Sequence, residues 1–151
     1  MKELLSTDIW TLHQPNNWVV ITVNGDVNKQ GKAVMGRGVA HQAALRFPAM
    51  PVFLANAIKT FGNNVHVFHH PFRLLSFPVK HHWMQNADLD LIHQSAEQLR
   101  EAWNQVSEET GGKIYLPSPG CKNGKLDWKD VKPILEPILD NRFTVVEIKP
   151  E

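Results

Sequence analysis

The stretch Trp18-Val19-Val20-Ile21-Thr22-Val23 decides the fold class of this chain. A continuous run of apolar and β-branched residues of this length predicts a strand that is buried on both faces. Asn24-Gly25 ends the strand. Gly36-Arg37-Gly38 then opens a predicted helix that runs through Arg46. A buried strand followed by a helix is the repeating unit of an α/β domain.

Working outward from this unit, strands and helices alternate along the chain. Strands are predicted at residues 65–68, 74–77, 113–116 and 143–148, and helices at 52–61 and from Leu89 to the glycines at 111–112. A last helix has apolar residues at 131, 134, 135 and 138, with Asp127 or Asp130 as its N-cap. We expect Pro133 in its first turn and Pro137 as a candidate kink. This order predicts a single α/β domain over residues 1–151, with a mostly parallel sheet covered on both faces.

Composition narrows the function classes. The 151 residues suit one domain, and 16 Lys and Arg against 15 Asp and Glu leave a net charge of +1. No overall field therefore indicates a nucleic-acid or membrane partner. The single cysteine, Cys121, excludes an internal disulfide and a multi-cysteine zinc site. Residues 1–8 lack the apolar run of a signal peptide, and no segment has the roughly 20 apolar residues that span a bilayer. We therefore expect a soluble, cytoplasmic protein, with a monomer as the default.

The loops at the carboxyl ends of the strands are where open α/β sheets bind ligands. These loops follow Val23, Phe77 and Leu116. The first places Gly36 and Gly38 at a helix start, where backbone N–H groups and the helix dipole attract an anion. The alternative is that both glycines only form the turn.

Two familiar phosphate loops nearly match the first loop, and both fail. Five residues separate Gly25 from Gly31, where a P-loop needs four, and His41 replaces the third glycine of a dinucleotide fingerprint. The loop over residues 117–126 is also rich in glycine and also leads into a helix. Two such loops in one small domain could hold a diphosphate from both sides.

The third loop reads Phe77-Pro78-Val79-Lys80-His81-His82-Trp83. A lysine between apolar residues at a strand end can be desolvated, which lowers its pKa and frees its amine as a nucleophile. The alternative is a surface lysine beside packing aromatic residues. The histidines form no metal-binding pattern, because no His-Glu-x-x-His or Cys-x-x-Cys spacing occurs, so we expect no metal. Cys121 has no identifiable base partner, and we expect it to pack rather than react.

In this order, the three loops resemble those of the macro domain family. Asp8-Ile9, ahead of the first predicted strand, is similar to the family's Gly-Asp-Ile/Leu element, although Thr7 stands where glycine is usual. Thr22-Val23-Asn24 and residues 34–40 (VMGRGVA) resemble its "VN…GVMGKGIA" segment. Residues 77–83 resemble the "FPTKxHW" run, and residues 120–128 the "GCGNGGLxW" loop, of the DarG antitoxins, which remove ADP-ribose from DNA.

The resemblance implies a three-layer α/β/α fold with a mostly parallel, mixed sheet and a pocket for ADP-ribose, without a cofactor. It implies that Asp8 accepts the adenine amino group, with the Ile9 backbone beside it, and that Asn24 meets the distal ribose. The diphosphate would lie between two sets of residues: Met35, Gly36, Arg37, Gly38 and Val39 on one side, and Gly120, Cys121, Lys122, Asn123 and Gly124 on the other. In the DarG-like and terminal ADP-ribose glycohydrolase branch, a lysine at the place of Lys80 is linked to attack on the anomeric carbon. His82 and Trp83 are candidate substrate contacts.

The sequence also departs from the family pattern. Lys122 replaces a glycine, and the loop from Gly25 to Lys32 is longer than usual. The catalytic aspartate of the terminal-glycohydrolase branch would fall at Gly124, which leaves Lys80 without that partner.

Three functions compete at this point. The first is a hydrolase that removes ADP-ribose from nucleic acid or protein through Lys80. The second is a module that binds ADP-ribose or a related nucleotide without turnover. The third is a nucleic-acid binder with a stacking and charge patch, formed by Arg73, Lys80, His81, His82 and Trp83.

Overall fold

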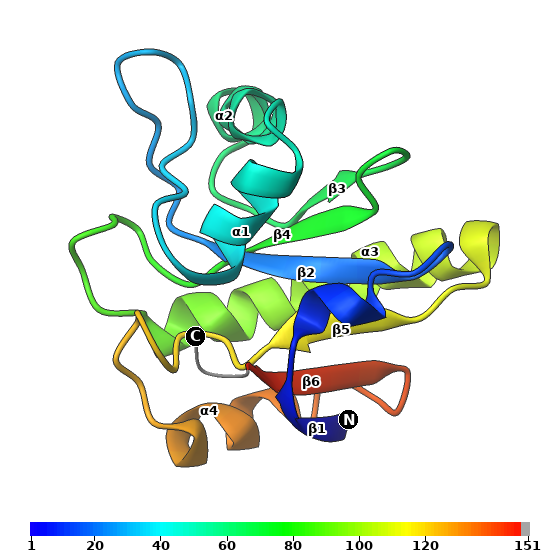
Figure 1. Cartoon of the computed structure of the whole chain (residues 1–151). Coiled ribbons are helices and arrows are strands. Elements are labelled where there is room, and N and C mark those ends of the chain that lie inside the picture. The colour runs from blue at the N-terminus through cyan, green and yellow to red at the C-terminus, as the bar shows by residue number, and fades with distance from the viewer. Residues whose placement is uncertain (149–151) are drawn as a thin grey trace.

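The computed structural model describes residues 1–148 of the chain, with the side chain of residue 148 left out. A six-stranded sheet lies between two layers of helices (Figure 1). The strands are β1 (Lys2–Thr7), β2 (Trp18–Val23), β3 (His66–Phe68), β4 (Leu74–Pro78), β5 (Ile114–Pro117) and β6 (Phe143–Ile148). The helices are the 3₁₀ helix η1 (Ile9–Leu12), α1 (Gly38–Arg46), α2 (Met50–Phe61), α3 (Leu89–Thr110) and α4 (Trp128–Leu135).

The sheet has the strand order β1-β6-β5-β2-β4-β3. All neighbouring strands are parallel except β3 and β4, which form an antiparallel edge. β2 and β4 end level, because Val23 pairs with Pro78, and β5 runs parallel to β2. The loops that follow β2, β4 and β5 therefore leave the same edge of the sheet. The predicted three-layer α/β/α fold with a mostly parallel, mixed sheet is confirmed.

The predicted central strand β2 is buried on both faces, as the apolar run indicates. Trp18 and Val20 face the core beneath α3 and α4, which also contains Trp103. Val19 and Ile21 face the core beneath η1, α1 and α2. Consecutive strand residues point to opposite faces, so a strand between two cores must be apolar throughout.

The first strand and η1 were not among the predicted elements. The side chains of Lys2 through Ser6 are all exposed, and β1 lies at the edge of the sheet beside β6. A strand with this little burial lacks the apolar alternation by which strands are predicted. Asp8 therefore follows the first strand rather than preceding it.

Neither proline near α4 lies where the sequence predicted it. The helix begins after Asp127, one of the two predicted N-caps, so Pro133 lies in the second turn rather than the first. Pro137 lies beyond the last helical residue, Leu135, and kinks nothing. A proline removes one helical hydrogen bond, which fits the short length of this helix.

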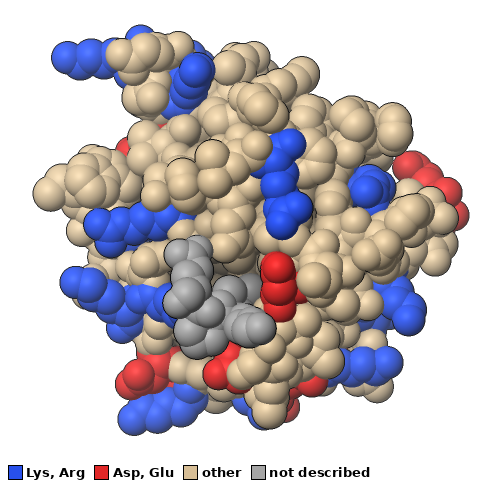
Figure 2. Space-filling model, in the orientation of Figure 1, with Lys and Arg blue, Asp and Glu red and all other residues tan. Residues whose placement is uncertain are grey.

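Among residues 1–148, no helix is both long and apolar enough to cross a membrane. The face shown in Figure 2 has Lys and Arg side chains spread over it, with Asp and Glu among them, in line with the near-zero net charge.

Candidate functional site

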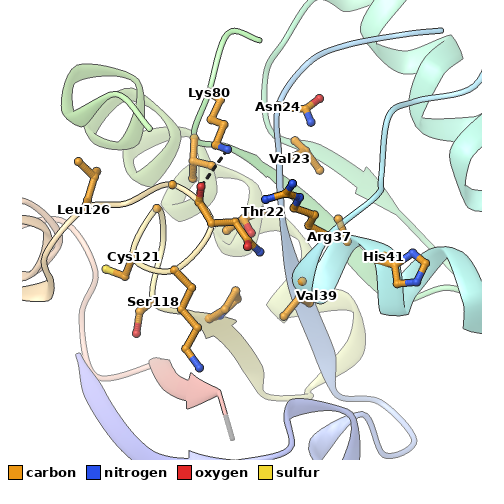
Figure 3. A pocket seen from close by; sticks show the side chains of 18 of the residues that line it. Thr22, Val23, Asn24, Arg37, Val39, His41, Lys80, Ser118, Cys121 and Leu126 are labelled. Carbon is orange, nitrogen blue, oxygen red and sulfur yellow. Dashed lines mark hydrogen bonds between the residues drawn. The ribbon is translucent and has the colours of Figure 1, made fainter. Parts of the chain in front are cut away.

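A cavity of about 1210 Å³ opens at the edge of the sheet where the parallel strands end. Its wall contains residues from all three loops selected in the sequence, including Asn24, Arg37, Lys80 and Cys121. Figure 3 shows Arg37 and Val39 on one side of this space, with Ser118 and Cys121 opposite. The fold thus brings together segments that are almost 100 residues apart in the sequence.

The first glycine loop ends in the N-terminus of α1. Arg37 is the N-cap residue in extended conformation, and its side chain makes no capping hydrogen bond to the described helix. The first N–H groups of a helix have no partners within the helix, so they are available to an anion. At Gly36 an added Cβ would meet no atom of residues 1–148 within 4 Å. A ligand can therefore approach the Gly36 backbone closely.

The second glycine loop folds back on itself. The Leu126 N–H donates to the carbonyl of Gly120, which has a φ of +74°. A Cβ at Gly124 would lie 2.5 Å from the same carbonyl oxygen, so position 124 has no room for a side chain. The loop also faces the first one, because a Cβ at Gly38 would lie 3.0 Å from the Asn123 amide nitrogen.

Lys80 follows β4 and reaches across to the second glycine loop. Its Nζ donates to the Asn123 carbonyl at 3.1 Å and to the Trp83 carbonyl at 3.4 Å. Partial burial lowers the pKa of Lys80, and the positive charges of Arg37 and Lys125 lower it further. A lysine with a lowered pKa beside a cavity has a larger fraction of neutral, nucleophilic amine.

Of the two residues expected near the ends of the ligand, Asn24 lines the cavity and Asp8 does not. Asn24 is held in place, since its amide donates to Val34 O at 3.3 Å and its oxygen accepts from Asp26 N at 3.0 Å. Asp8 caps η1, where its carboxylate accepts the Trp10 N–H. Neither Asp8 nor the buried Ile9 belongs to the described wall. Their assignment to adenine stays a prediction.

Of His81, His82 and Trp83 in the third loop, only Trp83 belongs to the described cavity wall. Trp83 lines the cavity, is 48% exposed, and its ring stacks on that of His82 with centroids 6.2 Å apart. His82 lies outside the wall among the described residues, and His81 binds Asp88 at 2.9 Å. Trp83 thus belongs to the described wall, and His82 contacts it from outside that wall. Their role as substrate contacts stays a prediction.

Cys121 lines the cavity but is a poor nucleophile. Partial burial, together with the nearby Asp127 carboxylate, raises the pKa of its thiol to about 11. The thiol therefore stays protonated near neutral pH. Within residues 1–148 no group of three or more His, Cys, Asp or Glu is placed to hold a metal ion.

Part of the wall was not found by the sequence analysis. Glu3, Leu4 and Leu5 of β1 and Glu147 of β6 line the end of the cavity away from Lys80, and His41 and Gln42 of α1 line it as well. The polar pair His41-Gln42 between the apolar residues Ala40 and Ala43 of α1 could have indicated the last two. The β1 residues carry no such pattern, because their side chains are exposed.

No protein-family model matches the sequence. The proteins named "DNA ADP-ribosyl glycohydrolase" of Mycobacterium tuberculosis and Mycobacterium bovis are each 31% identical to the chain over 107 residues. That alignment covers 66% of this chain, and the chain spans only 30% of the length of those relatives.

Solved structures match over nearly the whole chain. The macrodomain of Mycobacterium tuberculosis DarG matches with a TM-score of 0.76 at 24% identity. The match covers 100% of this chain and 99% of the DarG macrodomain chain. The macrodomain of Thermus aquaticus DarG matches with a TM-score of 0.74 at 24% identity, over 99% of this chain and 97% of that one. Thermosipho africanus DarTG in complex with ADP-ribose matches with a TM-score of 0.77 at 19% identity, over 97% of this chain and 42% of that one. The chain therefore has the fold of a macrodomain, and it resembles the DarG macrodomains in both sequence and structure.

Proposed function

We propose that the chain binds ADP-ribose in this cavity and removes it from a macromolecule to which it is attached. The observation that carries the proposal is the convergence of both glycine loops and the Lys80 amine on one cavity of about 1210 Å³. The relatives named DNA ADP-ribosyl glycohydrolase support DNA as the carrier of the ADP-ribose, with protein as the alternative. A net charge of only +1 provides little attraction for the phosphates of DNA. The chain would therefore recognise its substrate mainly through the ADP-ribose group.

In this proposal backbone groups hold the diphosphate. The N-terminus of α1 at Gly36 to Val39 provides N–H groups and a favourable dipole on one side. The loop from Gly120 to Gly124 closes the other side. Lys122, which replaces a glycine of the family pattern, is exposed on that loop and adds a positive charge toward the anion.

Lys80 would supply the chemistry at the distal ribose. Its neutral amine attacks the anomeric carbon, the bond from that carbon to the carrier breaks, and the carrier leaves with a proton. The ribose ring then opens: the bond from the anomeric carbon to the ring oxygen breaks, the N–H proton passes to that oxygen, and an imine forms. Water hydrolyses the imine, which releases open-chain ADP-ribose and restores the amine. The lowered pKa of Lys80 supports this role, because attack requires the neutral form.

Binding without turnover is the second candidate, and one observation favours it. A carboxylate at position 124 would be the expected partner of the lysine, yet the backbone around Gly124 leaves no room for a side chain. The two candidates differ at Lys80, because a binder needs the glycine loops but not the amine.

A paired release assay separates these functions. The wild-type chain and Lys80→Ala are incubated with ADP-ribosylated DNA and with ADP-ribosylated protein, and free ADP-ribose is measured. The hydrolase requires release by the wild type and loss of release in the variant. Equal release by both removes Lys80 from the mechanism, and no release from either substrate, with ADP-ribose still bound in calorimetry, leaves a binder. No heat of binding would overturn the cavity assignment itself.

A further inference from the structure

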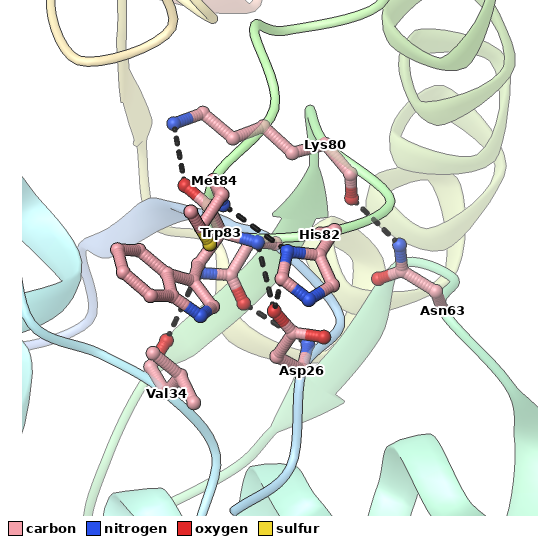
Figure 4. A network of polar contacts seen from close by, with 8 residues as sticks. Asp26, Val34, Asn63, Lys80, His82, Trp83 and Met84 are labelled. Carbon is pink, nitrogen blue, oxygen red and sulfur yellow. Dashed lines mark hydrogen bonds and ion pairs between the residues drawn. The ribbon is translucent and has the colours of Figure 1, made fainter.

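Asp26 lies in the long loop between Gly25 and Lys32, outside the segments that resemble the macro domain pattern. Its side chain is only 22% exposed. Figure 4 shows it between the loop that contains Lys80 and the segment that contains Val34. A carboxylate that is this buried needs hydrogen-bond donors to offset its lost hydration.

The donor is the backbone of the third loop. Asp26 Oδ2 accepts the Trp83 N–H at 2.7 Å and lies 3.7 Å from His82 Nδ1. The first distance lies at the short end of the range for hydrogen bonds to charged groups, a class that is about twice as strong as a neutral one. The Asp26 backbone is fixed as well, since its N–H donates to Asn24 Oδ1 and its carbonyl accepts from Val34 N.

Trp83 connects this carboxylate to Lys80. The N–H of Trp83 is held by Asp26, and the carbonyl of Trp83 accepts from Lys80 Nζ at 3.4 Å. From the other end, the amide of Asn63 donates to the Lys80 carbonyl at 3.0 Å. Lys80 is thus fixed at its backbone by Asn63. Its amine is held by two carbonyls, that of Asn123 at 3.1 Å and that of Trp83, whose backbone Asp26 holds.

We propose that Asp26 is a positioning residue, which aims the Lys80 amine into the cavity by holding the backbone of Trp83. This inference rests on the proposed chemistry of Lys80. It assigns a role to the long loop of this chain that the binding of ADP-ribose alone does not require. Asp26 touches no reacting atom in this scheme, so its loss acts on the reaction of Lys80 and not on the diphosphate.

Reductive trapping with free ADP-ribose tests the inference without requiring turnover. The Lys80 amine adds to the aldehyde carbon of open-chain ADP-ribose, and water leaves as the imine forms. Cyanoborohydride then delivers a hydride to the imine carbon, and water supplies the proton to nitrogen. The rate of adduct formation on the Lys80 peptide is followed by mass spectrometry at saturating ADP-ribose, and the Kd is measured by calorimetry.

Three variants are compared with the wild type. Asp26→Ala is expected to slow adduct formation about tenfold at saturation while the Kd changes less than about threefold, because misplacing a reacting group costs rate and not affinity. Asp26→Asn is expected to recover most of the rate, because its amide oxygen still accepts from Trp83 N. Asp90→Asn, on the exposed first turn of α3, is the matched control and is expected to behave as wild type.

Each outcome decides the inference. A wild-type adduct on Lys80 that Asp26→Ala forms at the same rate overturns the positioning role and leaves the proposed function standing. A loss of affinity in Asp26→Ala with an unchanged rate at saturation also overturns it, since the residue is then only part of the binding loop. The absence of any wild-type adduct while ADP-ribose is bound overturns the chemistry of Lys80, and the inference with it.

Discussion

At the scale of single residues, the cavity depends on positions that carry no side chain. Gly36 has open space where a Cβ would stand, and its φ lies outside the left-handed region. Gly124, by contrast, is packed against the Gly120 carbonyl. The two glycines therefore serve different purposes: the first leaves room for a ligand, and the second lets the loop fold.

Gly36→Glu is expected to weaken ADP-ribose binding at least tenfold, because a carboxylate would occupy the place of the diphosphate and repel it. The free energy of unfolding should change little, since nothing in the described structure clashes with a side chain there. Calorimetry and urea unfolding measure the two effects. Asn56→Glu, on an exposed position of α2 outside the cavity wall, adds the same group as a control. Unchanged affinity in Gly36→Glu would contradict the placement of the diphosphate.

The lowered pKa of Lys80 predicts a pH dependence. Because the neutral amine reacts, trapping on Lys80 should accelerate as pH rises and should level off below the ordinary lysine value of 10.5. Lys125→Gln removes one of the positive neighbours, so the pKa of Lys80 should rise and the rate profile should shift to higher pH. The rate is measured from pH 6 to 10, with Lys129→Gln on α4 as the control. A shift to lower pH would contradict the expected effect of Lys125, which is to lower the pKa of Lys80 through its positive charge.

At the scale of elements, the N-terminus of helix α3 is hydrogen-bonded to the third loop. Asp88 is its N-cap and accepts from the N–H groups of Asp90 and Leu91. The carboxylate also accepts from His81, so one residue connects the helix to the loop that contains Lys80. The backbone adds a further tie, because the Asp88 N–H donates to the Val79 carbonyl.

Asp88→Ala is expected to cost about 0.5–2 kcal/mol of unfolding free energy through loss of the cap. The His81 hydrogen bond lowers the pKa of Asp88 below its ordinary value of 3.8. The folded state therefore favours the charged form, and this part of the stability is present above that value and is lost as pH falls through the folded-state pKa. Urea unfolding at pH 7 and pH 3 checks both points. The difference between wild type and variant should shrink at pH 3, whereas Glu101→Ala, on an exposed position of α3, should show no such effect.

What the sequence could predict follows from how each element is buried. Strand β2 was predictable, because burial on both faces requires an unbroken apolar run. The exposed edge strand β1 was not, and the cavity wall at Leu4 and Leu5 was missed with it. The three loops were found because parallel strands end at one edge. The hydrogen bond from Trp83 to Asp26 was not, because it joins residues 57 positions apart through a backbone N–H, which leaves no residue pattern.

At the scale of the whole molecule, the cavity has walls from both ends of the chain and from its middle. β1 and β6 form one wall, and the loops after β2, β4 and β5 form the others. A ligand in this space touches elements that belong to both cores. Binding should therefore stabilise the whole fold and not one loop.

Saturation with ADP-ribose is expected to raise the melting temperature. At a ligand concentration of 100 times the Kd, linkage adds about 2.7 kcal/mol to the free energy of unfolding. For a domain of this size, that corresponds to roughly 5–10 °C. Differential scanning fluorimetry measures the shift, with AMP and ribose 5-phosphate as partial ligands. A shift of the same size with AMP alone would contradict a site that extends across the diphosphate to Lys80.

The pairing of β1 with β6 has a consequence for synthesis on the ribosome. Within the described sheet, Lys2–Thr7 pairs with no strand other than Phe143–Ile148, which is synthesised about 140 residues later. A nascent chain that stops before residue 143 has no partner for β1 and lacks the wall that β1 and β6 form together. β1 must therefore wait for β6 before it can dock on the sheet. Ligand binding thus reports that translation has passed the sixth strand, and a pull-down of stalled nascent chains on immobilised ADP-ribose would time that event.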